Sequence, residues 1–350
     1  MRKKKSGWKK RMATLKDIAK LAGVNKSTVS RALDGIGGVG EEKRKEILKI
    51  ADELGYIPDE SAKVLAGKNA RTIGIILPEL DCNYYASVVG TIEMKLKERG
   101  YSLIIGQTGF RYEDELHYLK LFIRKKVDGI LFDLYNTDIF QEQFEEIKKS
   151  INIPIVFIEN SLSLPEYGAI DIDNHFGVEL AIEHFAKSGF KRVGFVSEYL
   201  SSKIRLPAFE DALRKYGIPV DEKLIKIGKE RLEEGGYLRM KELIEQGELP
   251  EAVFASYDTM AHGALKALTE HGIRVPQDMS LIGFDNIREA SYFTVPLTTV
   301  APPVIEMGEI AVGSLLDKIE KKENSVGPHI SLKPRLVIRN SAKICDADRP

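Results

Sequence analysis

Three acidic side chains directly follow short apolar runs in the body of the chain. Asp133 follows Ile-Leu-Phe, Glu159 follows Val-Phe-Ile, and Asp285 follows Ile-Gly-Phe. Because the carboxyl ends of parallel strands lie along one edge of a sheet, side chains at these places can converge on one ligand. Carboxylates bind hydroxyl and N–H groups through charge-assisted hydrogen bonds. The pattern therefore indicates a site for a polar small molecule.

Aromatic and basic side chains stand at similar places along the same part of the chain. Tyr257 and Asp258 follow the run Val-Phe-Ala, Tyr84 and Tyr85 begin a predicted helix, and Arg205 begins another after the strand Phe195-Val196-Ser197. Tyrosine rings stack on pyranose faces, and arginine and carboxylates grip vicinal hydroxyls. Together these residues favour a sugar or a sugar-like polyol. For Asp258, capping of the following helix is a structural alternative.

The elements that must position these residues alternate between short apolar runs and amphipathic helical patterns. Strands are predicted at Ile73–Leu77, Ser102–Ile105, Gly129–Phe132, Ile155–Ile158, Val193–Val196, Ala252–Ala255, Leu281–Phe284 and Leu332–Ile338. Helices are predicted at Tyr85–Arg99, Leu180–Lys187, Pro207–Tyr216 and Thr259–His271. Alternating strands and helices indicate a doubly wound parallel sheet, and this many units indicate two such sheets.

The N-terminal part of the chain has a purely helical pattern. Thr14 and Asp17 fit a capping box ahead of an amphipathic run. Gly23 then ends this helix, and Asn25 is a good N-cap for a second helix over Lys26–Leu33. Two short helices joined by a turn that contains glycine are typical of the helix-turn-helix motif.

The second of these helices has one polar and one apolar face. At about 100° per residue, one side carries two cations and two hydroxyls, from Lys26, Ser27, Ser30 and Arg31. Such a face suits the major groove of DNA, although an ordinary surface helix has the same pattern. A third helix, predicted over Glu41–Leu54, completes a bundle too small to hold the ligand site.

The charge of the chain is unevenly distributed. Lys and Arg number 52 and so do Asp and Glu, which gives a formal net charge of zero. Residues 1–70 contain 17 Lys and Arg against 9 Asp and Glu, a net charge of +8, which leaves −8 for residues 71–350. A basic head on an acidic body is expected when one end of a chain contacts a polyanion.

Several classes of protein are disfavoured by the sequence. It contains no P-loop, no G-x-S-x-G and no HExxH, so we expect no enzyme activity. No run is long and apolar enough for a membrane helix or a signal peptide. The two cysteines, Cys82 and Cys345, form no CxxC motif, and the histidines show no metal-ligand spacing, so we expect no metal or cofactor and a reducing cytoplasm.

The run T-L-K-D-I-A-K-L-A-G-V-N-K-S-T-V-S-R-A-L-D-G, with A-D-E-L-G-Y-I-P ending at Pro58, resembles the headpiece of the LacI/GalR family of repressors. The resemblance implies that Lys26 and Ser27 select the operator sequence. It implies phosphate and base contacts for Ser30 and Arg31. Further backbone-positioning contacts are implied for Thr14, Asn25, Thr28 and Tyr56.

The same resemblance extends into the segment after Pro58. In the family a short hinge helix forms when two subunits clamp the operator, and a leucine wedges into the minor groove. Leu65 matches this leucine, and Ser61 and Ala62 are implied as neighbouring DNA contacts. Asp59 and Lys63 stand where the family usually has Asn and Arg, and an acid beside phosphates weakens binding unless it caps the hinge helix.

From residue 71 to about 340 the chain is similar to the periplasmic-binding-protein-like sensor of the same family. Arg205, in S-S-K-I-R-L-P-A-F, and Asp285, in G-F-D, match ligand-binding positions of the family, although Ala208 replaces a usual Gly. Tyr237 and Tyr257 stand where aromatic or amide contacts are frequent. The implied effector site is therefore Tyr84, Tyr85, Asp133, Glu159, Arg205, Tyr237, Tyr257, Asp258 and Asp285.

We accordingly expect a small all-α helix-turn-helix headpiece followed by α/β architecture with two doubly wound parallel-sheet lobes. The predicted segments are a basic tail (1–12), a DNA-binding domain (13–58), a hinge helix and linker (59–70), an effector-binding and dimerisation domain (71–340) and a polar tail (341–350). Lobe 1 is expected at about 71–159 and 291–322, and lobe 2 at about 160–290 and 323–340.

The predicted function is a cytoplasmic transcription regulator, most simply a repressor of carbohydrate-metabolism genes, controlled by a sugar-like effector. Its partners would be double-stranded operator DNA and a second copy, because no heptad tail for a tetramer is present and paired headpieces read a pseudo-palindrome. A purine- or nucleoside-responsive regulator of the same fold is the alternative. A transport-type solute-binding protein or an enzyme on this fold is a more remote alternative.

Replacing Arg31 with Ala should abolish specific operator binding and leave the sensor folded, because the cation would be lost from the DNA-facing side of the second helix.

Operator affinity of the unaltered protein should also fall steeply with salt, because phosphate contacts release counterions. Both are measured by fluorescence anisotropy with labelled operator DNA. Unchanged affinity of the variant would reject the recognition-helix assignment.

Overall fold

The computed structural model describes residues 13–35, 37–56, 70–134, 153–159, 169–321 and 329–343, and the structural statements below refer to these residues. The chain divides into two compact units, Met1–Ala70 and Arg71–Pro350. The first unit contains the headpiece and the second contains the sensor. None of the described helices is long and apolar enough to cross a membrane.

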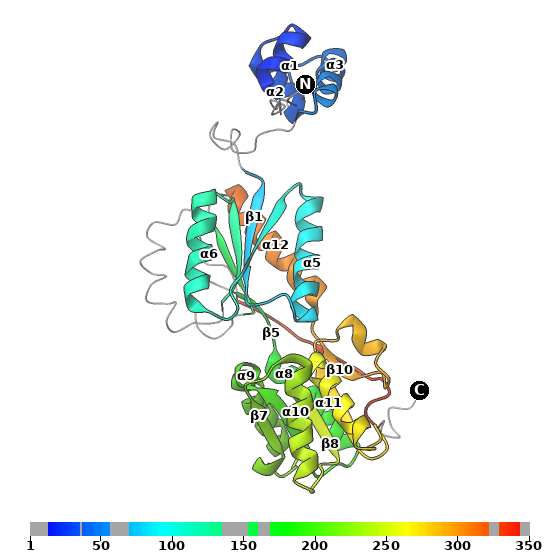
Figure 1. Ribbon diagram of the computed structural model, residues 1–350. Helices are drawn as coiled ribbons and strands as arrows, with labels where there is room; N and C mark the ends of the chain where they lie inside the picture. The colour runs from blue at the N-terminus through cyan, green and yellow to red at the C-terminus, as the bar shows by residue number, and fades with distance from the viewer. Residues whose placement is uncertain are drawn as a thin grey trace, which may run out of the picture. The chain divides into compact units, whose positions relative to one another are not determined.

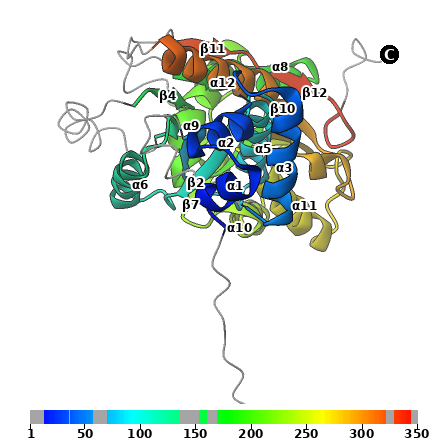
Figure 2. The same ribbon diagram turned by 90° about the horizontal axis from the view of Figure 1, so that it is seen from above.

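The headpiece consists of α1 (Leu15–Ala22), α2 (Lys26–Asp34) and α3 (Glu41–Glu53), which pack into a small bundle (Figures 1 and 2). Its core is formed by fully buried side chains that include Ile18, Val29 and Ile47. The predicted capping box is confirmed, since Thr14 and Asp17 exchange hydrogen bonds. Asn25 occupies the N-cap position of α2 but makes no side-chain capping bond there.

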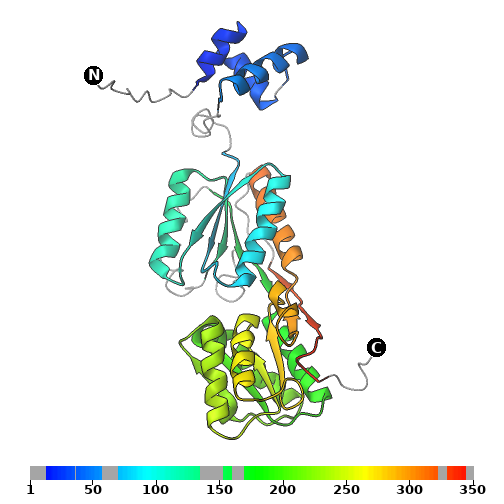
Figure 3. The same cartoon turned by 45° about the vertical axis from the view of Figure 1, so that its right-hand side comes forward.

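The first sheet of the sensor contains six parallel strands in the order β11-β5-β4-β3-β1-β2. The strands are β1 (Thr72–Leu77), β2 (Ser102–Gln107), β3 (Gly129–Asp133), β4 (Ile155–Ile158), β5 (Ala169–Ile172) and β11 (Ile330–Leu332). Helix α6 (Tyr112–Lys125) covers one face, and α5 (Asn83–Glu98) and α12 (Val304–Lys321) cover the other (Figures 1 and 3).

The second sheet has the order β12-β10-β9-β8-β6-β7, and β12 is antiparallel to β10. The strands are β6 (Val193–Glu198), β7 (Ile225–Gly228), β8 (Ala252–Ala255), β9 (Ser280–Phe284), β10 (Thr298–Ala301) and β12 (Arg335–Val337). Four helices pack on this sheet as two pairs: α8 (Asn174–Lys187) with α9 (Tyr199–Lys215), and α10 (Leu232–Glu245) with α11 (Asp258–Glu270). The 3-10 helices η2 (Glu222–Leu224) and η3 (Arg288–Ser291) complete the lobe.

The predicted division between the lobes was wrong for three strands. β5 and β11 pair in the first sheet although their residues were assigned to lobe 2, and β10 pairs in the second sheet although its residues were assigned to lobe 1. The chain therefore crosses between the lobes after β5, after β10 and after β11. Hydrogen bonding between strands that are distant in the sequence decides which sheet each strand joins. The local pattern of residues does not predict this pairing.

The strand predicted over Leu332–Ile338 is in fact two strands in two different sheets. β11 ends at Leu332 and β12 begins at Arg335, with Lys333-Pro334 between them. Proline has no N–H to donate to a ladder, so a strand cannot run through this position without a break. The interruption lets the last crossing between the lobes take place within two residues.

Helices α10 and α11 approach each other closely because glycines line their contact. A Cβ atom on Gly236 would overlap the carbonyl oxygen of Met260, and one on Gly263 would overlap the carbonyl oxygen of Glu233. Backbone meets backbone here, so no side-chain rotation can relieve the overlap. The close contact places the first residues of the two helices side by side, and the Leu232 N–H donates to the Tyr257 hydroxyl at 2.9 Å.

Gly236→Ala should therefore destabilise the sensor by about 3 kcal/mol, the upper end of the usual cost of overpacking. Gly313→Ala is the matched control, because Gly313 lies within α12 with no atom within 4 Å of the added Cβ. That variant should be stabilised by about 0.5–1 kcal/mol through the helix propensity of alanine. Urea unfolding of both variants tests this, and equal stabilities would contradict it.

Candidate functional site

The headpiece presents a polar face on α2. The side chains of Val29 and Ala32 are fully buried against α1 and α3, and Lys26, Ser27 and Arg31 are exposed. This division between the two faces is the one that the helical angles predict. The face therefore offers two cations and a hydroxyl to a partner, which is the chemistry of base and phosphate recognition.

The other headpiece residues expected to contact DNA differ in how far they are exposed. Asn25 is exposed, and Thr28, Ser30 and Tyr56 are half-buried around α2 and the core. The hydroxyl and N–H of Thr14 both donate to Asp17, at 2.7 and 2.8 Å, so this hydroxyl already takes part in the cap of α1. The expected hinge contacts at Ser61, Ala62 and Leu65 lie outside the described residues, and so does the expected hinge helix.

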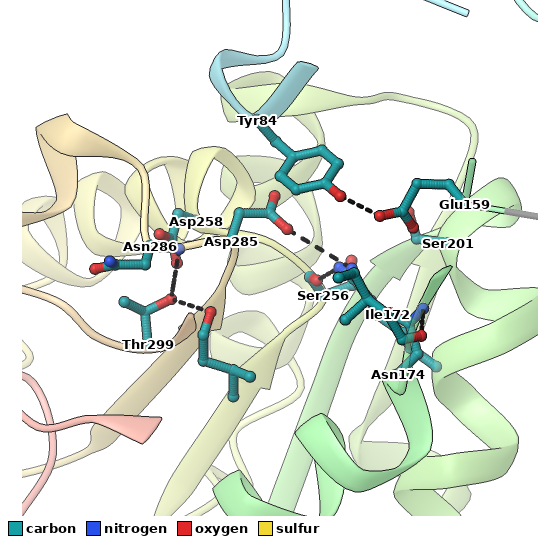
Figure 4. Close-up of polar contacts among 12 residues, drawn as sticks. Tyr84, Glu159, Ile172, Asn174, Ser201, Ser256, Asp258, Asp285, Asn286 and Thr299 are labelled. Carbon is teal, nitrogen blue, oxygen red and sulfur yellow. Dashed lines mark hydrogen bonds and ion pairs between the residues drawn. The ribbon is translucent and has the colours of Figure 1, made fainter. Parts of the chain in front are cut away.

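In the sensor, the first lobe brings four predicted residues together at the carboxyl ends of its strands. Tyr84, at the start of α5, donates a hydrogen bond to Glu159, which follows β4 (Figure 4). The rings of Tyr84 and Tyr85 meet edge to face, with their centres 5.4 Å apart. Asp133 ends β3, is almost fully buried, and interacts electrostatically with Glu159 and Tyr85.

The second lobe contributes Arg205 and Asp285. Their side chains form an ion pair of 3.6 Å between Nη2 and Oδ1. The guanidinium also donates to the carbonyl oxygen of Ser256 and to Oδ1 of Asn174, and it lies 3.8 Å from the centre of the Phe284 ring. These contacts hold Arg205 in one orientation at the carboxyl ends of β8 and β9.

Three of the predicted effector contacts have other partners. Asp258 is fully buried and accepts from the hydroxyl of Thr299 at 2.5 Å (Figure 4). It also accepts from the N–H of Ile287 at 2.9 Å. It therefore ties α11 to β10 and η3 and does not cap its own helix, and it lies close enough to Asp285 for that carboxylate to raise its pKa. The hydroxyl of buried Tyr257 accepts a hydrogen bond from the N–H of Leu232, the first residue of α10. Tyr237 lies on the outer side of α10, where its hydroxyl donates to Glu270 at 2.7 Å.

Burial raises the pKa values of the carboxyls in the cluster. Asp285 and Glu159 are each raised to a pKa of about 7, although Arg205 lowers both values. Burial and the nearby Glu159 raise the pKa of Asp133 well above its usual range. Near neutral pH these carboxyls are therefore poised to donate as well as accept hydrogen bonds. No group of side chains suited to holding a metal ion occurs among the described residues.

Sequence reasoning missed a second polar cluster beside the first. Arg231, just before α10, pairs with Glu79 at 2.5 Å and with Glu198 at 3.3 Å, and its guanidinium lies over the ring of Phe110. Glu198 is the last residue of β6, but Ser197 separates it from the apolar run, so the rule that located Asp133 does not reach it. Glu79 and Arg231 stand in loops beyond their strands, where no comparable pattern marks them.

Comparison with known proteins agrees with this division of the chain. A model described as "Bacterial regulatory proteins, lacI family" matches residues 14–59, and a "Periplasmic binding protein-like domain" matches residues 182–342. The chain is 32% identical over 339 residues to the HTH-type transcriptional repressor PurR of Haemophilus influenzae (strain PittEE), which covers 95% of this chain and 99% of that protein. The chain belongs to the LacI family.

Further relatives support the assignment over the full length of this LacI-family protein. PurR of Escherichia coli O1:K1 is 34% identical over 334 residues, 94% of this chain and 97% of that protein. A structure of the lac repressor dimer bound to operator and an anti-inducer has a TM-score of 0.83 at 24% identity, covering 95% of this chain and 99% of that one. A CelR–cellobiose complex has a TM-score of 0.70 at 26% identity, covering 94% and 100%.

The family assignment confirms the coarse prediction of function. This LacI-family protein is a DNA-binding transcriptional repressor and not an enzyme. The expected architecture is confirmed as well, since a helix-turn-helix headpiece precedes two parallel-sheet α/β lobes.

The raised pKa values of Glu159 and Asp285 should make the sensor less stable as pH rises. The two groups titrate near 4.5 and 3.8 in the unfolded chain and near 7 in the folded one, so between these limits the folded state binds more protons. Their stabilising contribution is therefore complete below about pH 4 and lost by about pH 7. Thermal unfolding from pH 4 to 8 should show a flatter profile for the Glu159→Gln, Asp285→Asn double variant. An unchanged slope would mean that neither group is perturbed.

Proposed function

We propose that this protein is a homodimeric repressor that binds a pseudo-palindromic operator and is controlled by a purine-type effector held between the two sensor lobes. The observation that carries the proposal is the cluster of Arg205, Asp285 and Glu159 at the carboxyl ends of strands from both sheets. Ligands of doubly wound sheets bind at these ends. The DNA partner implies a cytoplasmic location.

A purine fits the cluster better than the sugar that the sequence pattern favoured. The sugar argument depended on many carboxylates and tyrosines, but Asp258 bonds within its own lobe and Tyr237 faces away. Three carboxyls remain, and at least two of them titrate near neutrality. A purine edge offers ring N–H donors together with nitrogen and carbonyl acceptors, and such an edge matches a carboxyl that can accept or donate. The relatives named PurR respond to purines.

The aromatic side chains of the cluster support the same effector class. Tyr84 and Tyr85 lie together at the start of α5, beside the carboxyls. Aromatic rings pack well against a planar heterocycle, in offset-stacked or edge-to-face arrangements. A sugar remains the second candidate, because the CelR structure contains cellobiose.

A second copy of the chain is the proposed dimer partner. β2 lies at the edge of the first sheet, and its Ile104 and Ile105 side chains, one on each face of the sheet, are about 40% accessible. Exposed apolar side chains on a sheet edge favour pairing with another surface. The lac repressor with the same fold was crystallised as a dimer on its operator.

The experiment that tests the proposal is selection of genomic DNA fragments by the purified full-length protein at near-physiological salt. The selection is made without ligand, with purine bases and nucleosides, and with sugars that include cellobiose. A pseudo-palindrome whose enrichment depends on a purine would support the proposal. Dependence on a sugar would reject the purine effector, and enrichment that no compound alters would reject an effector of either class.

Asp285→Asn should weaken binding of the active purine roughly 10- to 100-fold, because a hydrogen bond to a charged group would be lost. Operator binding without effector should not change. Asp211→Asn is the matched control, since Asp211 is an exposed carboxylate on α9 whose partners are His175 and Arg214. Isothermal titration measures both variants. Equal affinities for the two variants would place the effector site elsewhere.

A further inference from the structure

Arg231 forms an ionic contact between the two sensor lobes. Its guanidinium, which precedes α10 in the second lobe, pairs at 2.5 Å with Glu79, which follows β1 in the first lobe. The same guanidinium pairs at 3.3 Å with Glu198 at the end of β6. It also lies 4.4 Å from the ring centre of Phe110, which follows β2 in the first lobe. One cation thus joins a carboxylate of each lobe.

The contact is largely shielded from water. The side chain of Arg231 is 24% exposed, that of Glu79 is 11% exposed and that of Glu198 is 1% exposed. A carboxylate at this depth is costly when it loses its partner, because neither water nor another cation replaces it at once. Separation of the lobes must take the cation away from Glu79, while Arg231 keeps Glu198 of its own lobe. The contact therefore favours the closed arrangement of the lobes.

Helix α9 connects this contact to the effector cluster. Glu198 caps α9 by accepting from the N–H groups of Leu200 and Ser201, at 2.6 and 2.8 Å. Two turns along the same helix, Arg205 is bound to Asp285 and to the carbonyl of Ser256. A helix transmits displacement along its axis with little bending, so a shift of Arg205 moves Glu198 against Arg231.

We propose that Glu79, Arg231 and Glu198 form a latch that holds the sensor lobes together before any effector is bound, and that α9 couples this latch to the effector site. The coupling rests on the proposed effector site, and the latch itself does not. The latch acts as a gate, because the side chains of Arg205 and Asp285 are only 15% and 6% exposed while the lobes are held together.

Cys82 supplies a native reporter of this separation. Its thiol is buried, and its pKa is raised to about 12 by burial and by the carboxylates of Asp285 in the second lobe and Glu79 in the first. The thiol therefore lies where the lobes face each other. An alkylating reagent can attack only the exposed thiolate, so its rate follows the population of the open arrangement.

The test measures the rate of N-ethylmaleimide labelling of Cys82 in the full chain carrying Cys345→Ser, without effector and without DNA. Arg231→Gln and Glu79→Gln should each raise this rate about tenfold, and the double variant should add little to either. Arg214→Gln is the matched control, because it removes two ion pairs of 2.8 and 2.9 Å that lie within α9. It should label at the rate of the parent protein.

Labelling of both Arg231→Gln and Glu79→Gln at the control rate would overturn the latch. Thermal unfolding accompanies each measurement, and if Arg231→Gln fails to fold, Glu79→Gln decides alone because it leaves Arg231 paired with Glu198. The assay involves neither operator nor effector, so its outcome is independent of the effector class. A latch that holds in this assay while no purine or sugar binds would reject the proposed function and leave the latch standing.

Discussion

The sensor depends on one arginine that is held from several sides. Arg205 lies over the ring of Phe284, pairs with Asp285 and donates to the backbone of Ser256 and to Asn174. Without this cation, buried carboxyls from the two lobes would repel each other across a poorly hydrated space. The cluster is stable because the positive charge is fixed in place, and its fixed geometry also makes it selective toward a ligand.

The surrounding fold places charged side chains at the carboxyl ends of the strands. In each sheet the parallel strands deliver their last residues to one edge, so acids that are far apart in sequence become neighbours. Close backbone packing between α10 and α11 brings the loop before α10 against the start of α11. That packing fixes Arg231 beside Glu198 and leaves it within reach of Glu79. Ligand site and lobe contact thus arise from the same arrangement of strand ends.

The sequence predicted the headpiece almost completely, because caps, a glycine turn and helical periodicity are local signals. It also located Asp133, Glu159 and Asp285, since each follows an apolar run directly. It failed where distant pairing decides the outcome, as for β5 and β10, whose short runs Ala-Ile-Asp-Ile and Thr-Thr-Val-Ala contain polar residues. The bond of Asp258 to Thr299 could not be predicted because the two residues lie 41 positions apart, and no pattern around Tyr237 reveals that its hydroxyl bonds to Glu270.

The three crossings between the lobes also set the order in which the chain can fold during synthesis. The headpiece is continuous in sequence and its bundle is complete once residue 56 is available. The first lobe instead awaits β11 and the second awaits β12, at residues 330–337, so neither sheet has all its strands until nearly the whole chain exists. Such distant pairing slows folding and keeps unpaired strand edges exposed. A nascent chain therefore carries a finished DNA-binding head well before it has a sensor to control it.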